Sequence, residues 1–138
     1  MNYKAIAPKT IGHLYEAHAS IRQSEVDESL IALIELRVAQ VNGCAYCCAF
    51  HSNELRNFGL PQELVDKIPG YRHSASFSRE QELVLRYADA VTTLSADLDD
   101  IKKQLALHFS DKQLVEITAS AALMNALTRL RIVLGEKY

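Results

Sequence analysis

This chain lacks several features that are typical of specialised protein classes. Its 138 residues include no tryptophan, only three prolines and only five glycines, which excludes collagen-like and low-complexity sequences. The 15 basic and 17 acidic residues nearly cancel, so the clustered basic excess typical of a nucleic-acid-binding domain is absent. No apolar run approaches the roughly 18 residues of a membrane span, and no secretory signal opens the chain. We therefore expect a cytoplasmic protein with no nucleic-acid or membrane partner.

The composition that remains is that of an ordinary globular protein. Hydrophobic residues make up 49% of the chain and charged residues 23%. A chain of this length forms one domain and buries enough surface for a core without disulfide support. We expect residues 1–138 to be a single domain.

The sequence contains several residue patterns that typically begin or end helices, and strand signals are weak. It predicts an all-α fold of six or seven helices. A Ser24–Asp27 capping box opens the first clear helix, and Gly43 suits the left-handed position at its end. The predicted segments are Glu25 to Val41, Cys44 to Asn57, Gln62 to Ile68, a helix capped by Ser78 and Gln81 that reaches Leu94, Leu98 to Phe109, and a helix capped by Ser110 and Gln113 that reaches Leu134, with a loop from Tyr71 to Phe77.

The last predicted helix is unusually apolar. From Ile117 to Leu127 its residues are apolar or small on every side, except around Ser120 and Asn125. A helix that is apolar all round is buried all round. It therefore needs either a central position or a subunit interface, which indicates a homo-oligomer.

The three cysteines lie within five positions, as Cys44, Cys47 and Cys48. An odd number crowded into one place is not a disulfide framework, and in a reducing compartment such a group is catalytic or binds metal. On a helix that starts after Gly43, the three cysteines and His51 form one stripe. The positive end of the helix lowers a thiol pKa, and its first turn can tighten enough for a reversible Cys44–Cys47 disulfide.

The stripe allows roles to be assigned. His51 lies one turn beyond Cys47 and can take its thiol proton, so we interpret Cys47 as the attacking thiolate and Cys44 as the resolving thiol. Cys48 either competes for Cys44 or fills the core as a small apolar residue. Glu35, on the preceding helix, would face His51 if the two helices pack as a hairpin across Asn42 and Gly43.

The run from Ile34 to Cys47, followed by His51, resembles the core of the AhpD-like alkylhydroperoxidase and carboxymuconolactone decarboxylase family. The N-G-C-x-Y-C-x-x-x-H element is far more specific than a bare C-x-x-C. The stretches 77–82 and 125–130 also resemble the family's helix start after the loop and its C-terminal asparagine–arginine element. The resemblance covers the chain from about Ser29 to Arg131.

The resemblance implies a compact multi-helix domain that assembles as trimers or hexamers, with the C-x-x-C at the start of a core helix. It also implies thiol-dependent peroxide reduction, in which Cys47 attacks the peroxide, Cys44 resolves the intermediate, and His51 and a glutamate relay protons. This chain has Ala32 where the alkylhydroperoxidase branch commonly has that glutamate, and Glu35 stands on the same helix face. Thr128 stands where many members have a second asparagine.

Two other functions use the same residues. Two or three cysteines and His51 could bind zinc with Glu35 or Glu54 as a further ligand, but no distant ligand pair is present. The dithiol could also serve a thiol–disulfide reductase or a redox sensor that turns over no peroxide. No nucleotide fingerprint such as G-x-G-x-x-G occurs, so no cofactor is expected and electrons must come from an external dithiol reductant.

Overall fold

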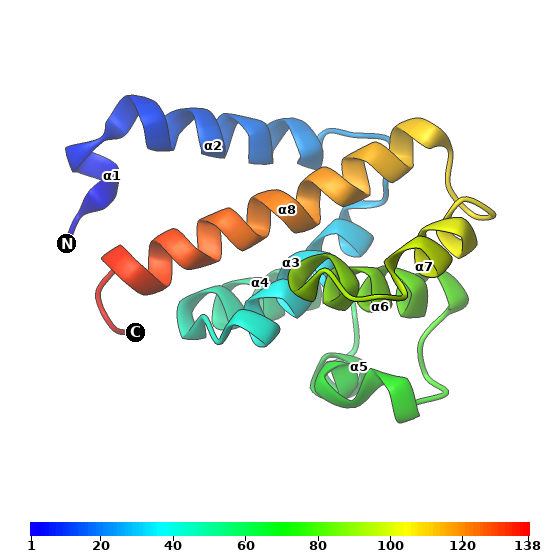
Figure 1. The fold of residues 1–138 in the computed structure, drawn as a ribbon. Helices are drawn as coiled ribbons and strands as arrows, with labels where there is room; N and C mark the ends of the chain where they lie inside the picture. Colours follow the sequence, from blue (N-terminus) through cyan, green and yellow to red (C-terminus); the bar gives the residue numbers. More distant parts are fainter.

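The computed structural model describes residues 1–138 and consists of helices without strands, which confirms the all-α prediction (Figure 1). There are eight α-helices and one 3₁₀ helix, because two N-terminal helices precede those predicted. In chain order they are α1 (Tyr3–Ile6), α2 (Pro8–Arg22), α3 (Glu28–Asn42), α4 (Ala45–Asn57), α5 (Gln62–Lys67), the 3₁₀ helix η1 (Ile68–His73), α6 (Arg79–Thr93), α7 (Leu98–Leu105) and α8 (Asp111–Leu134).

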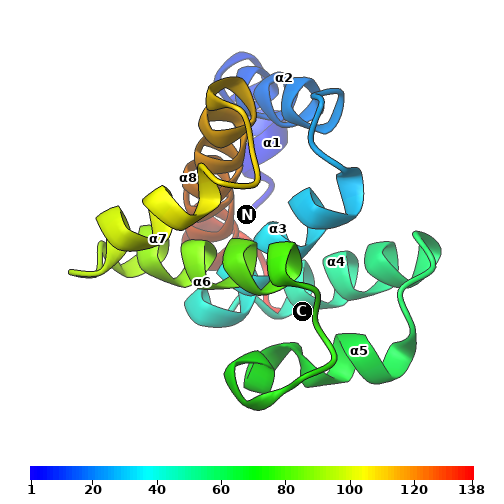
Figure 2. The same cartoon turned by 90° about the vertical axis from the view of Figure 1, so that its right-hand side faces the viewer.

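Helix α3 lies at the centre of the fold. It packs most extensively against α4, α6 and α8, which surround it in Figure 2. Its buried residues occupy all sides of the helix, as expected for a central element. They are Leu30, Ile31, Ala32, Leu33, Ile34, Glu35, Leu36, Val38 and Ala39. Helix α3 therefore carries one ionisable side chain, Glu35, into the core.

Helix α8 is not buried on every side in the single chain, so it does not take the central position that was one of the two predicted alternatives. One face packs on α3 and α6, and α2 lies alongside it in the opposite direction (Figure 1). Val115 and Val133 remain 68% and 75% exposed. By length and composition α8 is the one helix that could cross a membrane. In this chain its buried residues are part of the protein core.

Most of the predicted helix ends are confirmed. Gly43 ends α3 with a φ of 74°, and the capping boxes at Ser78 and Ser110 open α6 and α8. The Ser24 box was wrong: Ser24 Oγ accepts from the Val26 N–H within the preceding turn, and Asp27 caps α3 by accepting from Ser29 N–H. The helix therefore begins at Glu28, three residues later than predicted.

Two other boundaries differ from the prediction. The 3₁₀ helix η1 (Ile68–His73) includes Tyr71–His73, the first three residues of the expected loop. Pro69 helps to start η1, and the Tyr71 hydroxyl donates to Asp89 at 2.8 Å. Helix α7 ends at Leu105, and the next residues form a turn that leads to the Ser110 cap.

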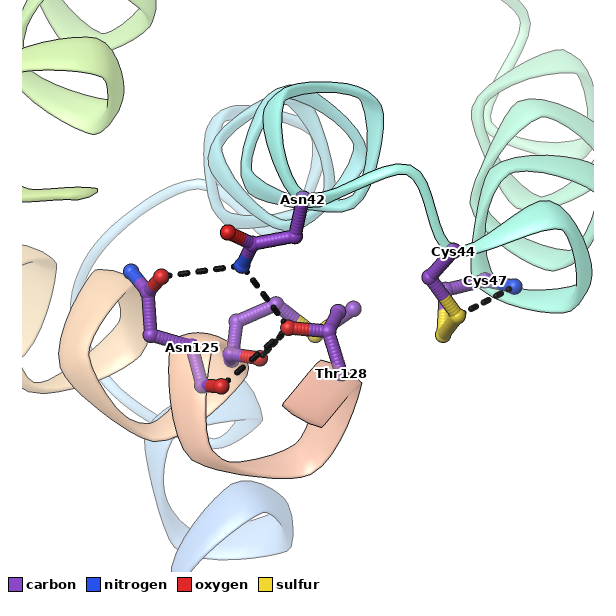
Figure 3. Close-up of a disulfide and its surroundings, with 6 residues drawn as sticks. Asn42, Cys44, Cys47, Asn125 and Thr128 are labelled. Carbon is purple, nitrogen blue, oxygen red and sulfur yellow. Dashed lines mark hydrogen bonds between the residues drawn. A yellow bond between two sulfur atoms is a disulfide. The ribbon is translucent and has the colours of Figure 1, made fainter. Parts of the chain in front are cut away.

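Asn42 is the last residue of α3. Its side chain connects the turn between α3 and α4 to α8 by hydrogen bonds. Its Nδ2 donates to Asn125 Oδ1 and to Thr128 Oγ1, both at 2.9 Å (Figure 3). Thr128 thus accepts a hydrogen bond in the place where many family members have asparagine. Because Gly43 follows directly, this anchor sets the direction in which α4 leaves the corner.

The left-handed conformation of Gly43 predicts that alanine substitutions at Gly43 and at Gly12 have opposite effects on the free energy of unfolding. In Gly43→Ala a side chain must adopt the left-handed conformation, so we expect a loss of about 1 kcal/mol in the free energy of unfolding. Gly12→Ala, inside α2 with open space around it, is the control and should gain about 0.5 kcal/mol. Urea unfolding measures both, and equal effects of the two substitutions would contradict the role of Gly43.

Candidate active site

The two cysteines of the C-x-x-C pair form a disulfide at the start of α4. The Cα atoms of Cys44 and Cys47 lie 5.3 Å apart (Figure 3). Cys44 is the N-cap of α4 rather than its first residue, and its Sγ accepts from the Cys47 N–H at 3.3 Å. Both cysteines are buried. The pairing predicted as feasible from the spacing is the one present.

Cys48 is the remaining free thiol. It is half-buried, packs against the hydrophobic core, and has its pKa raised by burial. A raised pKa leaves little reactive thiolate near neutral pH. Cys48 therefore behaves as a small core residue and does not replace Cys47 as the partner of Cys44.

Two carboxylate groups lie within hydrogen-bonding distance of one ring nitrogen of His51. His51 Nδ1 lies 3.0 Å from Glu54 Oε1 and 3.3 Å from Glu35 Oε2. Because both carboxylates are acceptors when ionised, Nδ1 must carry a proton. The other nitrogen, Nε2, is then left free of these acceptors in the neutral imidazole and can itself accept a proton.

Arg22 from α2 holds both carboxylates. Its Nη2 lies 2.5 Å from Glu35 Oε2 and 2.5 Å from Glu54 Oε1. Burial opposes ionisation of Glu54, but the bonds from His51 and Arg22 outweigh it and lower its pKa to about 2. Burial acts in the same way on Glu35, and the contacts with His18, Arg22 and His51 lower its pKa. Both groups are therefore carboxylates at neutral pH.

Glu35 also binds a second imidazole. Its Oε1 lies 2.9 Å from His18 Nε2, while its Oε2 faces His51. The carboxylate is 1% exposed, so its charge is almost wholly compensated by these side chains. One buried carboxylate thus joins two histidines that come from different helices.

Three of the four predicted site residues lie along α4, with Cys44 as its N-cap and Cys47 and His51 within it. The fourth, Glu35, contacts His51 from α3. The i, i+3 spacing of His51 and Glu54 could have indicated the second carboxylate as a relay partner. His18 and Arg22 had no such signal, because α2 was not predicted and neither residue belongs to a recognised motif.

The cluster of Glu35, His51 and Glu54 has the donor types of a metal site, with ligand atoms within 4.8 Å of one another. However, the Arg22 guanidinium bonds to both carboxylates and repels a cation there. The cysteines do not belong to this cluster. In the structure these side chains form an ion-pair network.

A cavity of about 310 Å³ opens beside Cys47 and His51. Its walls are mostly apolar or aromatic. The lining residues are Tyr3, Lys4, Tyr15, His18, Tyr46, Cys47, Phe50, His51, Met124, Leu127 and Arg131. Cys44 is not among them and instead borders a depression under the C-terminal residues. The two sulfurs therefore face different surroundings.

Fold and site together define an AhpD-like helical domain with a C-x-x-C disulfide at the start of a core helix. Residues 7–90 match the carboxymuconolactone decarboxylase family, and the chain belongs to that family.

Solved structures share the fold. A protein of unknown function from Agrobacterium tumefaciens, whose description suggests an AhpD antioxidant defence protein, superposes with a TM-score of 0.93 at 27% identity over 100% of this chain and 96% of that one. An uncharacterized peroxidase-related protein from Silicibacter sp. TM1040 gives 0.81 at 19% identity over 91% and 68%. The second likeness shows the fold alone.

Two curated relatives are themselves uncharacterized. YdfG of Bacillus subtilis is 22% identical over 99% of this chain and 95% of its own length. YnjA of Escherichia coli is 29% identical over 78% of this chain and 60% of its own length.

The Arg22 contacts predict a strong coupling with Glu35. Arg22→Met leaves a buried carboxylate without its main partner and should lower the free energy of unfolding by about 3 kcal/mol. In Arg22→Met/Glu35→Gln the stranded charge is gone, so the loss should be smaller than the sum of the single variants. Arg56→Met, at an exposed position on α4, is the control and should cost under about 0.5 kcal/mol. Additive losses in the double-mutant cycle would contradict the coupling.

The lowered pKa of Glu54 predicts a pH dependence of stability. A depressed carboxylate pKa gives stability that is present above the unfolded value, near 4.5, and is lost as pH falls towards about 2. We expect Glu54→Gln to be less stable than the wild type at pH 7 and to lose less stability between these pH values. Urea unfolding at several pH values measures this, with exposed Glu28→Gln as the control. Parallel curves for wild type and Glu54→Gln would show that Glu54 has no part in the acid sensitivity.

Proposed function

We propose that this protein is a thiol-dependent peroxidase that cycles between a Cys44/Cys47 dithiol and their disulfide. The observation that carries the proposal is the cavity in which Cys47 lies beside His51, while Cys44 is held at the helix end outside it. A nucleophilic thiol, a base and an apolar space for an organic group thus share one site. The family membership and the antioxidant description of the Agrobacterium protein support the same function.

The first half of the cycle consumes peroxide. His51 accepts the Cys47 thiol proton, and the thiolate attacks the outer peroxide oxygen. The O–O bond breaks, Cys47 becomes a sulfenic acid, and the departing oxygen takes a proton to leave as an alcohol or as water. Glu35 and Glu54 stabilise the imidazolium that forms between these proton transfers.

The second half restores the thiols. The Cys44 thiol displaces the hydroxyl of the Cys47 sulfenic acid, which releases water and forms the disulfide. An external dithiol, from a protein or a small molecule, then reduces this disulfide and is itself oxidised to a disulfide. In this cycle the disulfide form described above is the oxidised resting state.

We further propose a cytoplasmic homo-oligomer, a trimer or a hexamer, as the family resemblance implies. Support comes from exposed small and apolar residues along the outer face of α8, which a neighbouring subunit would cover. They are Val115, Ala119, Ala122 and Val133.

The proposed function predicts a fast reaction of the reduced protein with peroxide. Stopped-flow mixing of pre-reduced protein with hydrogen peroxide and with an organic hydroperoxide should consume peroxide well above the rate of free cysteine, with two thiols lost per chain. Cys47→Ser should abolish the reaction, and His51→Ala should slow it by about a hundredfold. Cys44→Ser should stop at a sulfenic acid that dimedone traps.

Cys48→Ser is the matched control and should react as the wild type does. A wild-type rate no faster than that of free cysteine would reject the peroxidase. The same dithiol would then be assayed against protein disulfides, as a reductase, and for an oxidation-dependent change in assembly, as a sensor.

A further inference from the structure

The cavity beside Cys47 has two chemically different ends. Lys4 and Arg131, together with Tyr3, line both this cavity and an adjoining depression near the chain termini. His18, Cys47 and His51 line only the cavity. Lys4 and Arg131 therefore mark the end at which the cavity meets the adjoining depression, and Arg131 also lines the depression that Cys44 borders.

Neither cation at this end has a carboxylate partner. Lys4 Nζ lies 4.5 Å above the centre of the Tyr15 ring, and Arg131 Cζ lies 4.0 Å above that of Tyr46. The Tyr15 side chain raises the pKa of Lys4, and this effect outweighs burial, which lowers it. Glu136 lines the adjoining depression but forms no ion pair with either cation. Arg131 is half-buried and Lys4 is exposed, whereas the half-buried Arg22 and Arg37 are paired with carboxylates.

The ring contacts orient the half-buried Arg131 and the exposed Lys4 towards neighbouring aromatic rings. Cation–π contacts are compatible with a simultaneous bond to an anion, because an ammonium or guanidinium keeps donors that do not face the ring. Preorganised donors lose less entropy on binding. A mostly apolar cavity with two such cations at one end is complementary to a molecule with an apolar body and an anionic head.

We propose that the substrate is an organic hydroperoxide that carries a carboxylate, bound with the carboxylate at Lys4 and Arg131 and the hydroperoxide at Cys47. This inference rests on the proposed function and names its substrate class. The carboxylate takes no part in the chemistry: the Cys47 thiolate becomes a sulfenic acid, the O–O bond breaks, and the hydroperoxy acid leaves, after protonation of its alkoxide, as a hydroxy acid. Lys4 and Arg131 are specificity residues.

The selectivity is tested with two substrates that differ only in charge. One is a decanoic acid that carries a hydroperoxide at the end of its chain, and the other is its methyl ester. Stopped-flow oxidation of the reduced protein should give a second-order rate constant about tenfold higher for the acid. In Lys4→Gln and in Arg131→Gln the acid-to-ester ratio should fall towards one, and in Arg131→Lys, which keeps the charge, it should recover in part.

A binding measurement separates this proposal from the peroxidase itself. The oxidised protein cannot react with peroxide, so calorimetry of its binding to decanoate, with methyl decanoate as the uncharged comparison, reports the cation end alone. We expect decanoate to bind more tightly than the ester and to lose this advantage in Lys4→Gln and Arg131→Gln. Lys9→Gln, at an exposed position on α2, should leave both the preference and the binding as in the wild type.

The outcomes are distinct. Equal rates for acid and ester, with no preference for decanoate, would overturn the substrate class and leave the peroxidase standing. Decanoate binding without peroxide turnover would reject the peroxidase and retain the site for an apolar carboxylate. An acid preference that survives Lys4→Gln/Arg131→Gln would show that these two cations do not read the carboxylate.

Discussion

The structure depends on compensating one charge in the middle of its core. Glu35 lies on α3, the helix most enclosed by the others, and an unpaired carboxylate at such a place is too costly to persist. Arg22 and His18 from α2 and His51 from α4 satisfy it. The fold and the site therefore depend on the same interactions. The contacts that allow Glu35 to stay ionised also bring α2 and α4 together. A hydrophobic residue would stabilise the core as well, but it would not hold Nδ1 of a histidine.

The parts of the fold that local patterns control could be predicted from the sequence. The end of α3 at Gly43 and the capping boxes at Ser78 and Ser110 need only a few neighbouring residues, and all three are present as expected. Helix α2 was missed because Ile11 is its only buried residue, so it lacks an apolar stripe. It is held by α8 and by the polar contacts of Arg22 and His18, which no periodicity reveals. The Ser24 cap failed because Asp27, three residues later, offered the α3 amides a better acceptor.

The departures from the family pattern have physical explanations in the same residues. Ala32 stands in place of a common glutamate, and Glu35, one turn further along α3, reaches His51 from the same side. The buried carboxylate is tolerated there because Arg22 and His18 contact it and compensate its charge. Thr128 offers a hydroxyl oxygen where an asparagine would offer an amide, and Asn42 still finds its acceptor. In both places the sequence alone identifies the different residue, but only the structure shows the contacts that this residue makes.

The two half-reactions of the proposed cycle require different properties of the Cys44 and Cys47 sulfurs. The surroundings of the two sulfurs differ in a way that fits these requirements. In peroxide reduction the thiolate must meet the substrate beside a base, and Cys47 lines the cavity with His51. In disulfide reduction the sulfur with the lower thiol pKa leaves more readily. Cys44, at the N-cap, accepts the Cys47 N–H and lies at the positive end of the α4 dipole, so the helix stabilises a thiolate there. An incoming reductant would then bond to Cys47 through the cavity and expel Cys44, so that one helix start serves both half-reactions.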